Sequence, residues 1–318
     1  METNVPSIEV RGLTKAFGKF TALDHLDLKL EGAKCVGFLG PNGAGKTTTL
    51  KMLTDMIFPT AGEAFINEEP VRENRKRALA HAGVLIESPE IYPSLTPREA
   101  LEMVADLRKI PSSEWTERID TVLAEVKMSD WADRKVGSFS KGMKQRINIA
   151  STLVHDPQVL ILDEPATGLD PRGMAEVRDI VRGLKKRSRL VFMSSHILQE
   201  VTDVCDEVAL IDQGKLLFYD TLSNVTAKFQ RGHSSIDASF ARPLPPDAVE
   251  RQLAGLPSVT RVEGLDPLRV RFYFSGGLDA QEAILKRVSA LDLGLVSFTE
   301  SRSALEEVYL SQIAKGDS

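Results

Sequence analysis

Short apolar runs recur along this chain, and polar segments with helical spacing separate them. The runs are CVGFLG (Cys35 to Gly40), GVLIES (Gly83 to Ser88), VLIL (Val159 to Leu162) and RLVFMSS (Arg189 to Ser195). Continuous apolar runs of this length are typical of strands that are buried on both faces of a parallel sheet. The pattern therefore predicts an α/β fold in which buried strands alternate with helices.

The start of the chain has a different pattern, in which apolar and polar residues alternate. From Ile8 to Ala22 the alternation predicts a strand followed by a turn around Gly18. The segment AGEAFINEEP (Ala61 to Pro70) predicts a hairpin that turns at Gly62 and has a short strand from Ala64 to Asn67. We therefore expect an antiparallel β subdomain beside the parallel sheet.

A helical insertion is predicted at about residues 90–150, before the run VLIL. The spacing of apolar residues is helical from Thr96 to Gly137. The segment TPREALEMVADLRKI opens with Thr96 as N-cap, Pro97 at the first helical position and Glu99 in the capping-box position. The insertion separates the glycine-rich segment GPNGAGKTT from the next strand that ends in acidic residues.

The last part of the chain predicts a second, smaller domain. Beyond about Asp220, QRGHSS and ARPLPPD are typical of linkers, and strand, helix, strand and helix patterns follow. These patterns cover residues 268–274, 278–290, 295–299 and 303–316. We expect one domain at residues 1–225 and an accessory α+β domain at residues 226–318, with no catalytic cluster in the latter.

Composition restricts the classes of partner. The 318 residues are 42% hydrophobic and carry a formal net charge of -5, which allows two cores and argues against nucleic-acid binding. The start METNVPSIEV lacks the features of a signal peptide, and no stretch reaches the ~18 apolar residues of a membrane span. We therefore expect a cytoplasmic protein. Cys35 and Cys205 fit buried free thiols better than a disulfide or a metal site.

The segment GPNGAGKTT fits the phosphate-loop pattern G-x-x-x-x-G-K-[ST]. Glycine lets backbone N–H groups approach a phosphate chain, Lys46 supplies a positive charge, and the hydroxyl of Thr47 can bind Mg²⁺. The alternative is a glycine-rich turn with a chance lysine, which does not account for the strand before the loop and the helix after it. The residues predicted to bind nucleotide here are Gly40, Pro41, Asn42, Gly43, Ala44, Gly45, Lys46, Thr47 and Thr48.

Two adjacent carboxylates, Asp163 and Glu164, follow the run VLIL. Asp163 is predicted to hold Mg²⁺ through water, and Glu164 to polarise the water that attacks the γ-phosphate. A purely structural role would leave two uncompensated buried carboxylates, which is costly. Glu87 comes at the end of another predicted parallel strand, where such sheets bind ligands.

Three further candidates have ordinary structural alternatives. Phe17 can stack on a purine base, although sheet packing is the commoner role of a phenylalanine. Ser140 precedes a helix that begins at Lys141, and it can simply cap that helix. His196 follows the run RLVFMSS and can sense a phosphate oxygen through a ring N–H, or it can be a cap or a packed ring.

Taken together, these motifs resemble the nucleotide-binding subunit of ATP-binding cassette (ABC) transporters, over roughly residues 5–225. GPNGAGKTT resembles the Walker A motif of that family, VLILDEP its Walker B motif with the catalytic glutamate, and FSKGMKQR its LSGGQ signature. The segment from Thr167 to Asp170 resembles the D-loop. The resemblance implies a P-loop NTPase core that binds ATP and Mg²⁺.

The resemblance also implies roles for particular residues. Phe17 would stack on adenine, His196 would be the switch histidine, and Glu87, where the family normally has glutamine, would approach Mg²⁺ and the attacking water. Two copies would pair head to tail, with each ATP between one Walker A and the partner's signature, and hydrolysis would drive an integral membrane permease. The signature and the D-loop would contribute Ser140, Gly142 and Asp170 to nucleotide binding.

The chain departs from the family pattern in two places. The signature has Phe139 in place of leucine and Lys141 in place of its first glycine, and Lys141 can point outward or add charge near the γ-phosphate. With glutamate at position 87, this segment of the chain resembles the corresponding segment of exporters that protect cells from peptide antibiotics. The segment LEEVYL near the end of the chain likewise resembles drug, antibiotic and lipid export ATPases.

Two other classes of protein also contain a phosphate loop. A soluble ABC protein of translation or DNA repair usually has two cassettes or a long coiled coil, and this chain shows one cassette and no heptads. A small-molecule kinase or a GTPase would lack the signature, and a GTPase would carry N-K-x-D, which is absent from the sequence. The sequence therefore favours the transporter subunit.

Overall fold

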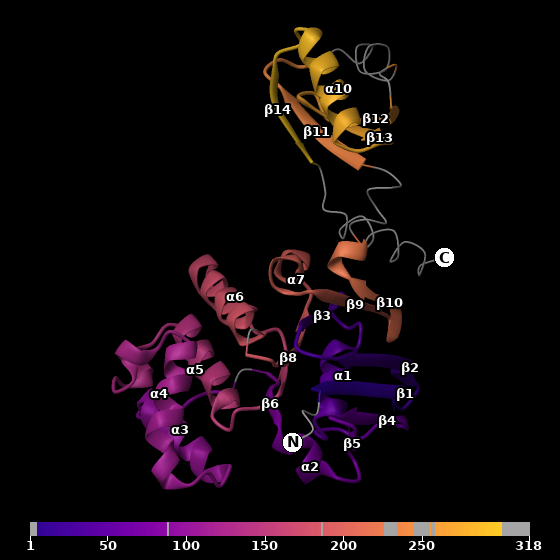
Figure 1. Ribbon diagram of the computed structural model, residues 1–318. Coiled ribbons are helices and arrows are strands. Elements are labelled where there is room, and N and C mark those ends of the chain that lie inside the picture. Colours follow the sequence, from indigo (N-terminus) through magenta and orange to yellow (C-terminus); the bar gives the residue numbers. More distant parts are fainter. Residues whose placement is uncertain are drawn as a thin grey trace. The chain divides into compact units, whose positions relative to one another are not determined.

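The chain forms two compact units, residues 1–220 and 221–318 (Figure 1). The computed structural model describes residues 5–87, 89–185, 187–225, 234–244, 255 and 258–300. Each unit has its own core of buried apolar side chains. The helix predicted at 303–316 lies outside the described residues, as do parts of both expected linkers.

A six-stranded sheet with the order β10-β9-β3-β8-β7-β6 forms the centre of the first unit. Its strands are β3 (Cys35–Leu39), β6 (Ala82–Leu85), β7 (Val159–Leu162), β8 (Leu190–Ser195), β9 (Glu207–Asp212) and β10 (Lys215–Thr221). The five strands from β9 to β6 pair in parallel, so the prediction of buried parallel strands is confirmed. Their carboxyl ends therefore share one edge of the sheet. Cys35 and Cys205 are free and buried, as expected.

The predicted antiparallel sheet is also present, with the order β2-β1-β4-β5. It consists of β1 (Ser7–Phe17), β2 (Phe20–Glu31), β4 (Ala61–Ile66) and β5 (Glu69–Pro70). The turn at Gly18 is confirmed, and β2, which continues from it to Glu31, was not predicted. Gly62 does not form a turn, because it lies inside β4, where a Cβ atom would come 2.3 Å from the carbonyl oxygen of Gly12. Close approach of two strands requires the glycine there.

Helices pack against the parallel sheet and form the insertion. They are α1 (Lys46–Leu53), α2 (Arg75–Ala80), α3 (Pro97–Leu107), α4 (Trp115–Glu125), α5 (Lys141–Leu153), α6 (Pro171–Lys185) and α7 (Leu198–Val204), with short 3-10 turns η1 (Ser112–Glu114), η2 (Ser129–Trp131) and η3 (Val136–Ser138). The helices α3, α4 and α5 lie together (Figure 1). The capping box is confirmed, since the Thr96 hydroxyl accepts from Glu99 N–H at 3.2 Å and the Glu99 carboxylate accepts from Thr96 N–H at 2.7 Å. In place of a regular helix, residues 129–131 and 136–138 form 3-10 turns, because Ser, Asp and Gly there disfavour a helix.

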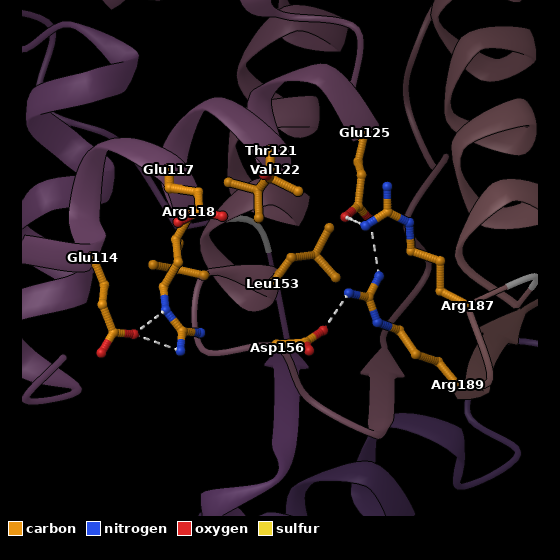
Figure 2. A pocket seen from close by; sticks show the side chains of 11 residues that line it. Glu114, Glu117, Arg118, Thr121, Val122, Glu125, Leu153, Asp156, Arg187 and Arg189 are labelled. Carbon is orange, nitrogen blue, oxygen red and sulfur yellow. Dashed lines mark hydrogen bonds and ion pairs between the residues drawn. The ribbon is translucent and has the colours of Figure 1, made fainter.

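A charged pocket of about 390 Å³ lies between α4 and the segments that lead into β7 and β8 (Figure 2). The carboxylate of Glu125, at the end of α4, lies 2.8 Å from Arg187 and 2.8 Å from Arg189. Arg189 also donates to Asp156 at 2.8 Å. The side chains of Arg189 and Glu125 are only 4% and 8% exposed, so each buried charge needs its partner. The network fastens α4 to the amino ends of the strands.

The second unit has an antiparallel sheet with the order β12-β13-β11-β14 and a helix that packs on it. The strands are β11 (Ser234–Phe240), β12 (Val259–Asp266), β13 (Arg269–Phe274) and β14 (Leu295–Glu300), and the helix is α10 (Leu278–Ala290). Ile284 and Val288 of α10 pack on the apolar face of the sheet. The α+β prediction is therefore confirmed. The strands β11 and β12 were not predicted, because polar residues occupy much of both.

Candidate nucleotide site

The glycine-rich loop joins β3 to α1 at the carboxyl edge of the parallel sheet. A Cβ atom on Gly40 would come 2.3 Å from the carbonyl oxygen of Ile211, so only glycine fits there. Gly43 and Gly45 have φ values of 83° and 105°, in the region that favours glycine. No side chain caps α1, and its first turn has no acidic residue. Its first N–H groups are therefore available to an anion.

The side chain of Lys46 is held in place by the loop that carries it. Its ammonium group donates to the carbonyl oxygens of Gly40 at 2.7 Å and Pro41 at 3.0 Å. Only 5% of the side chain is exposed, and burial lowers the pKa of Lys46, while the charges of Glu164 and Asp163 oppose that shift. Carbonyl dipoles and carboxylates thus fix a positive charge inside the loop.

The acid pair follows β7, as predicted from the sequence. Glu164 has a φ of 43°, which is unusual for a residue other than glycine. Its carboxylate accepts from the hydroxyl of Thr167 at 2.9 Å and lies 3.7 Å from the ammonium of Lys46. Burial raises the pKa of Glu164, but the Thr167 hydroxyl, His196 and Lys46 outweigh it, so the net shift is downward. Glu164 therefore remains ionised at neutral pH.

His196 lies next to the same carboxylate. Its Nδ1 is 3.1 Å from Oε1 of Glu164, although no hydrogen bond forms at that nitrogen. The alternative role as a helix cap is wrong, because the N-cap of α7 is Ile197 and no side chain caps that helix. The ring is 31% exposed, so it is not a packed core residue either. The structure thus brings Lys46, Glu164 and His196 together.

Ser194 belongs to the same cluster and was not predicted from the sequence. Its hydroxyl donates to Oδ1 of Asp163 at 2.5 Å and accepts from the backbone N–H of Glu164 at 2.9 Å. The only signal in the sequence is a pair of polar residues, Ser194 and Ser195, at the end of an otherwise apolar strand. Buried hydroxyls need partners, so this signal indicates that something polar lies opposite.

The signature segment begins α5. Ser140 is exposed and caps the helix, accepting from Met143 N–H at 3.2 Å, so the capping role is confirmed. Phe139 is buried and packs edge-on against Trp131, with ring centroids 5.7 Å apart. A buried aromatic pair thus occupies the place where the family has leucine. Gln145, further along α5, donates to the carbonyl of Pro165 at 2.8 Å and links this helix to the acid pair.

Lys141 and Asp170 are placed by contacts with the D-loop and the helix after it. A Cβ atom on Gly168 would come 2.5 Å from the ammonium of Lys141, so this side chain lies against the D-loop. The carboxylate of Asp170 accepts from Gly173 N–H at 3.0 Å and caps the first turn of α6. Gly142, in turn, is buried close to Gly173.

Phe17 and Glu87 make their contacts with other residues than Lys46, Glu164 and His196. Phe17 is 50% exposed at the end of β1, which excludes the core-packing alternative, and the ammonium of Lys15 lies 4.9 Å from its ring centroid. The strand before Glu87 is shorter than predicted, since β6 ends at Leu85 and Glu87 has a φ of 58°. Its carboxylate is 72% exposed and pairs with Lys51 at 2.7 Å.

The donors that could hold Mg²⁺ are few. In the part of the chain that the structure describes, no cluster of three or more His, Cys, Asp or Glu side chains could bind a metal. Mg²⁺ bound with a nucleotide usually takes only one or two protein ligands, and water and phosphate oxygens supply the rest. The half-buried Thr47 and Asp163 fit that requirement.

Comparisons with known proteins agree with this site. A family model described as ABC transporter matches residues 23–167. The bacitracin transport ATP-binding protein BcrA of Bacillus licheniformis is 44% identical over 211 residues, which are 66% of this chain and 68% of that protein. The uncharacterized ABC transporter ATP-binding protein YxlF of Bacillus subtilis is 30% identical over 306 residues, 96% of this chain and 99% of that protein. A solved ATP binding subunit of an ABC transporter has a TM-score of 0.62 and 26% identity, covering 70% of this chain and 92% of that one.

The parallel sheet, the phosphate loop and the acid pair define a P-loop ATPase. The relatives narrow the class further. This chain belongs to the ABC transporter family and is an ATP-binding subunit that hydrolyses ATP.

Proposed function

We propose that two copies of this chain bind ATP head to tail and that hydrolysis drives export through a separate membrane permease. The observation that carries this proposal is the convergence at Glu164. The ammonium of Lys46 lies 3.7 Å from one of its oxygens, and Nδ1 of His196 lies 3.1 Å from the same oxygen. This set can hold a phosphate, activate a water and respond to the terminal phosphate.

The roles of the single residues follow from their surroundings. Glu164 is the general base, since its lowered pKa keeps it ionised. Thr47 and Asp163 hold Mg²⁺, which neutralises the phosphate charge, and Phe17 offers an exposed ring to adenine. The loop residues 40–48 surround the phosphates. Glu87 lies close enough to α1, through Lys51, to pass a change at the nucleotide to the helical insertion.

The proposed dimer uses the exposed amino end of α5. Ser140 and the first N–H groups of that helix form an anion site with the charge of Lys141 beside them. In a head-to-tail pair, this end would complete the phosphate cage of the partner chain, together with Gly142 and Asp170. Each chain thus lends the half-site that its neighbour lacks.

The proposed cargo and location come from the relatives. The name of BcrA states bacitracin transport, and the glutamate at position 87 agrees with an exporter of peptide antibiotics. Among the described residues, no helix is both long and apolar enough to cross a bilayer. We therefore place the chain on the cytoplasmic face of the membrane, held there by an integral permease, with no role for nucleic acid.

The test is purification of the tagged chain from detergent-solubilised membranes. A permease with several membrane-spanning helices is expected to co-purify, and ATP with Mg²⁺ is expected to convert the isolated chain from monomer to dimer in size-exclusion chromatography with light scattering. Full ATP turnover by a strictly monomeric chain that has no membrane partner would contradict the proposal.

A further inference from the structure

We infer that Ser194 is a positioning residue for ATP hydrolysis, whose single hydroxyl holds Asp163 and Glu164 in one arrangement. This inference rests on the roles proposed for those two acids. Ser194 is at the carboxyl end of β8 and is fully buried. Its hydroxyl bonds to Asp163 and Glu164, so it acts through these two acids.

The hydrogen bonds of Ser194 use both functions of a hydroxyl. The group donates its one hydrogen to Oδ1 of Asp163 at 2.5 Å, and it accepts from the backbone N–H of Glu164 at 2.9 Å. A bond to a charged carboxylate is stronger than a neutral one, particularly where water is excluded. One oxygen atom therefore connects the side chain of one acid to the backbone of the next.

The backbone of Glu164 shows why this connection affects the geometry. With a φ of 43°, Glu164 has a left-handed conformation that costs free energy for a residue with a Cβ atom. The bond from its N–H to Ser194 stabilises that conformation, which in turn determines where the Glu164 side chain leaves the backbone. The Thr167 hydroxyl then holds the carboxylate at the far end, at 2.9 Å.

The next residue on β8 serves a different network. The hydroxyl of Ser195 accepts from Ile197 N–H at 2.9 Å and donates to Glu200 at 2.6 Å. Successive residues of a strand face opposite sides, so Ser195 cannot replace Ser194 at the acid pair. Loss of the Ser194 hydroxyl would therefore leave the Asp163 carboxylate without this donor and the Glu164 N–H without this acceptor.

The experiment compares full-length Ser194→Ala and Ser194→Thr with the parent chain. Four quantities are measured: kcat, KM for ATP, the gain in affinity for a fluorescent ATP analogue when Mg²⁺ is added, and the melting temperature. For Ser194→Ala we expect kcat to fall about tenfold to a hundredfold, with KM for ATP changed less than about threefold. We also expect the Mg²⁺-dependent gain in affinity to fall about tenfold, while affinity without Mg²⁺ stays the same.

The Thr variant separates positioning from simple stability. It keeps a hydroxyl at the same place, so it should recover most of the lost kcat and of the Mg²⁺ effect. The matched control is Ser151→Ala on α5, which removes a half-buried hydroxyl that bonds only the carbonyl of Asn148, and it should leave both quantities unchanged. A folded Ser194→Thr protein that is as slow as Ser194→Ala would overturn the inference.

An Asp163→Asn arm distinguishes failure of this inference from failure of the proposed roles. If Asp163→Asn loses the Mg²⁺ effect and Ser194→Ala keeps it, Ser194 is not a positioning residue and the role of Asp163 stands. If Asp163→Asn keeps the Mg²⁺ effect, the role proposed for Asp163 is wrong and the inference is overturned with it. The inference is also overturned if both Ser194 variants lose melting temperature and kcat to the same extent as each other while the Mg²⁺-dependent gain in affinity is unchanged.

Discussion

The ammonium of Lys46 lies 3.7 Å from a carboxylate oxygen of Glu164, although the two residues follow different strands. Lys46 begins α1 after β3, and Glu164 follows β7. Parallel pairing brings these strand ends to one edge, with β8 between β3 and β7. A bound phosphate chain would compete with the Glu164 carboxylate for the same ammonium, so nucleotide binding and the state of the base are linked.

Replacement of Lys46 by alanine should remove tight ATP binding. The variant loses the charge-assisted contacts of the ammonium, and we expect affinity to fall by about a hundredfold. Isothermal titration with ATP and Mg²⁺ measures the change. Lys29→Ala, an exposed lysine paired with Glu31, is the control and should bind as the parent does. Unaltered affinity in Lys46→Ala would contradict the assignment of the phosphate loop.

Replacement of Glu164 by glutamine should trap an ATP-bound dimer. Glutamine keeps the size of the side chain but cannot take the proton of the attacking water, so we expect kcat to fall about a hundredfold or more. Light scattering after gel filtration with ATP should show a stable dimer. A variant that stays monomeric with ATP and still hydrolyses it at the parent rate shows that Glu164 is not the base.

Replacement of Ser140 by arginine should block hydrolysis and leave ATP binding to the isolated chain intact. The large side chain would fill the space at the amino end of α5 where a partner's phosphate is proposed to bind. Mixing Ser140→Arg with Lys46→Ala chains tests the head-to-tail arrangement, because one site of each mixed dimer has both an intact loop and an intact signature. Recovery of ATPase activity on mixing is expected, and a mixture as inactive as its parts argues for sites formed within one chain.

Replacement of Glu87 by glutamine should leave nucleotide binding intact. The change breaks the ion pair with Lys51, but the Glu87 side chain is 72% exposed, so the melting temperature should barely move. The expected loss is in coupling, seen as ATPase activity that no longer responds to the permease in reconstituted vesicles. Loss of ATP affinity in titration would refute a coupling role for this residue.

His155 should make stability depend on pH below neutrality. Burial, with the positive charge of Arg108 nearby, lowers the pKa of His155 from its ordinary value of 6.5 to about 4. The unfolded chain then takes up a proton at higher pH than the folded chain does, so this stability is present above pH ~6.5 and is lost as pH falls toward ~4. We expect a loss on the order of 2 kcal/mol by pH ~5. Urea unfolding at several pH values should show this loss in the parent and not in His155→Gln.

Much of the fold could be predicted because its signals are local. Residues such as Val36, Leu160 and Phe192 belong to unbroken apolar runs, and such runs are typical of strands buried on both faces. The strand β2 was not predicted, because polar residues interrupt its apolar ones and its pairing with β1 is a contact between segments. Strands β11 and β12 were missed for the same reason.

Some residues of the candidate site could likewise be predicted from the sequence, and others could not. Lys46, Asp163 and Glu164 belong to contiguous motifs, so their spacing in the sequence identified them. Ser194 acts through a contact between two strands, and no spacing within one segment reveals it. The same is true of the pairing of Glu87 with Lys51 and of the position of Lys141 against Gly168, which depend on how loops meet in space.

The ion pairs of Arg187 and Arg189 with Glu125 restrict how the helical insertion can move. Because these ion pairs hold one end of α4, the helix can rotate about that end but cannot translate away from it. Any displacement of α4 that keeps these ion pairs is therefore a swing centred near Arg189, and the arc it describes grows with distance from that pivot. Parts of the insertion far from the pivot would travel furthest.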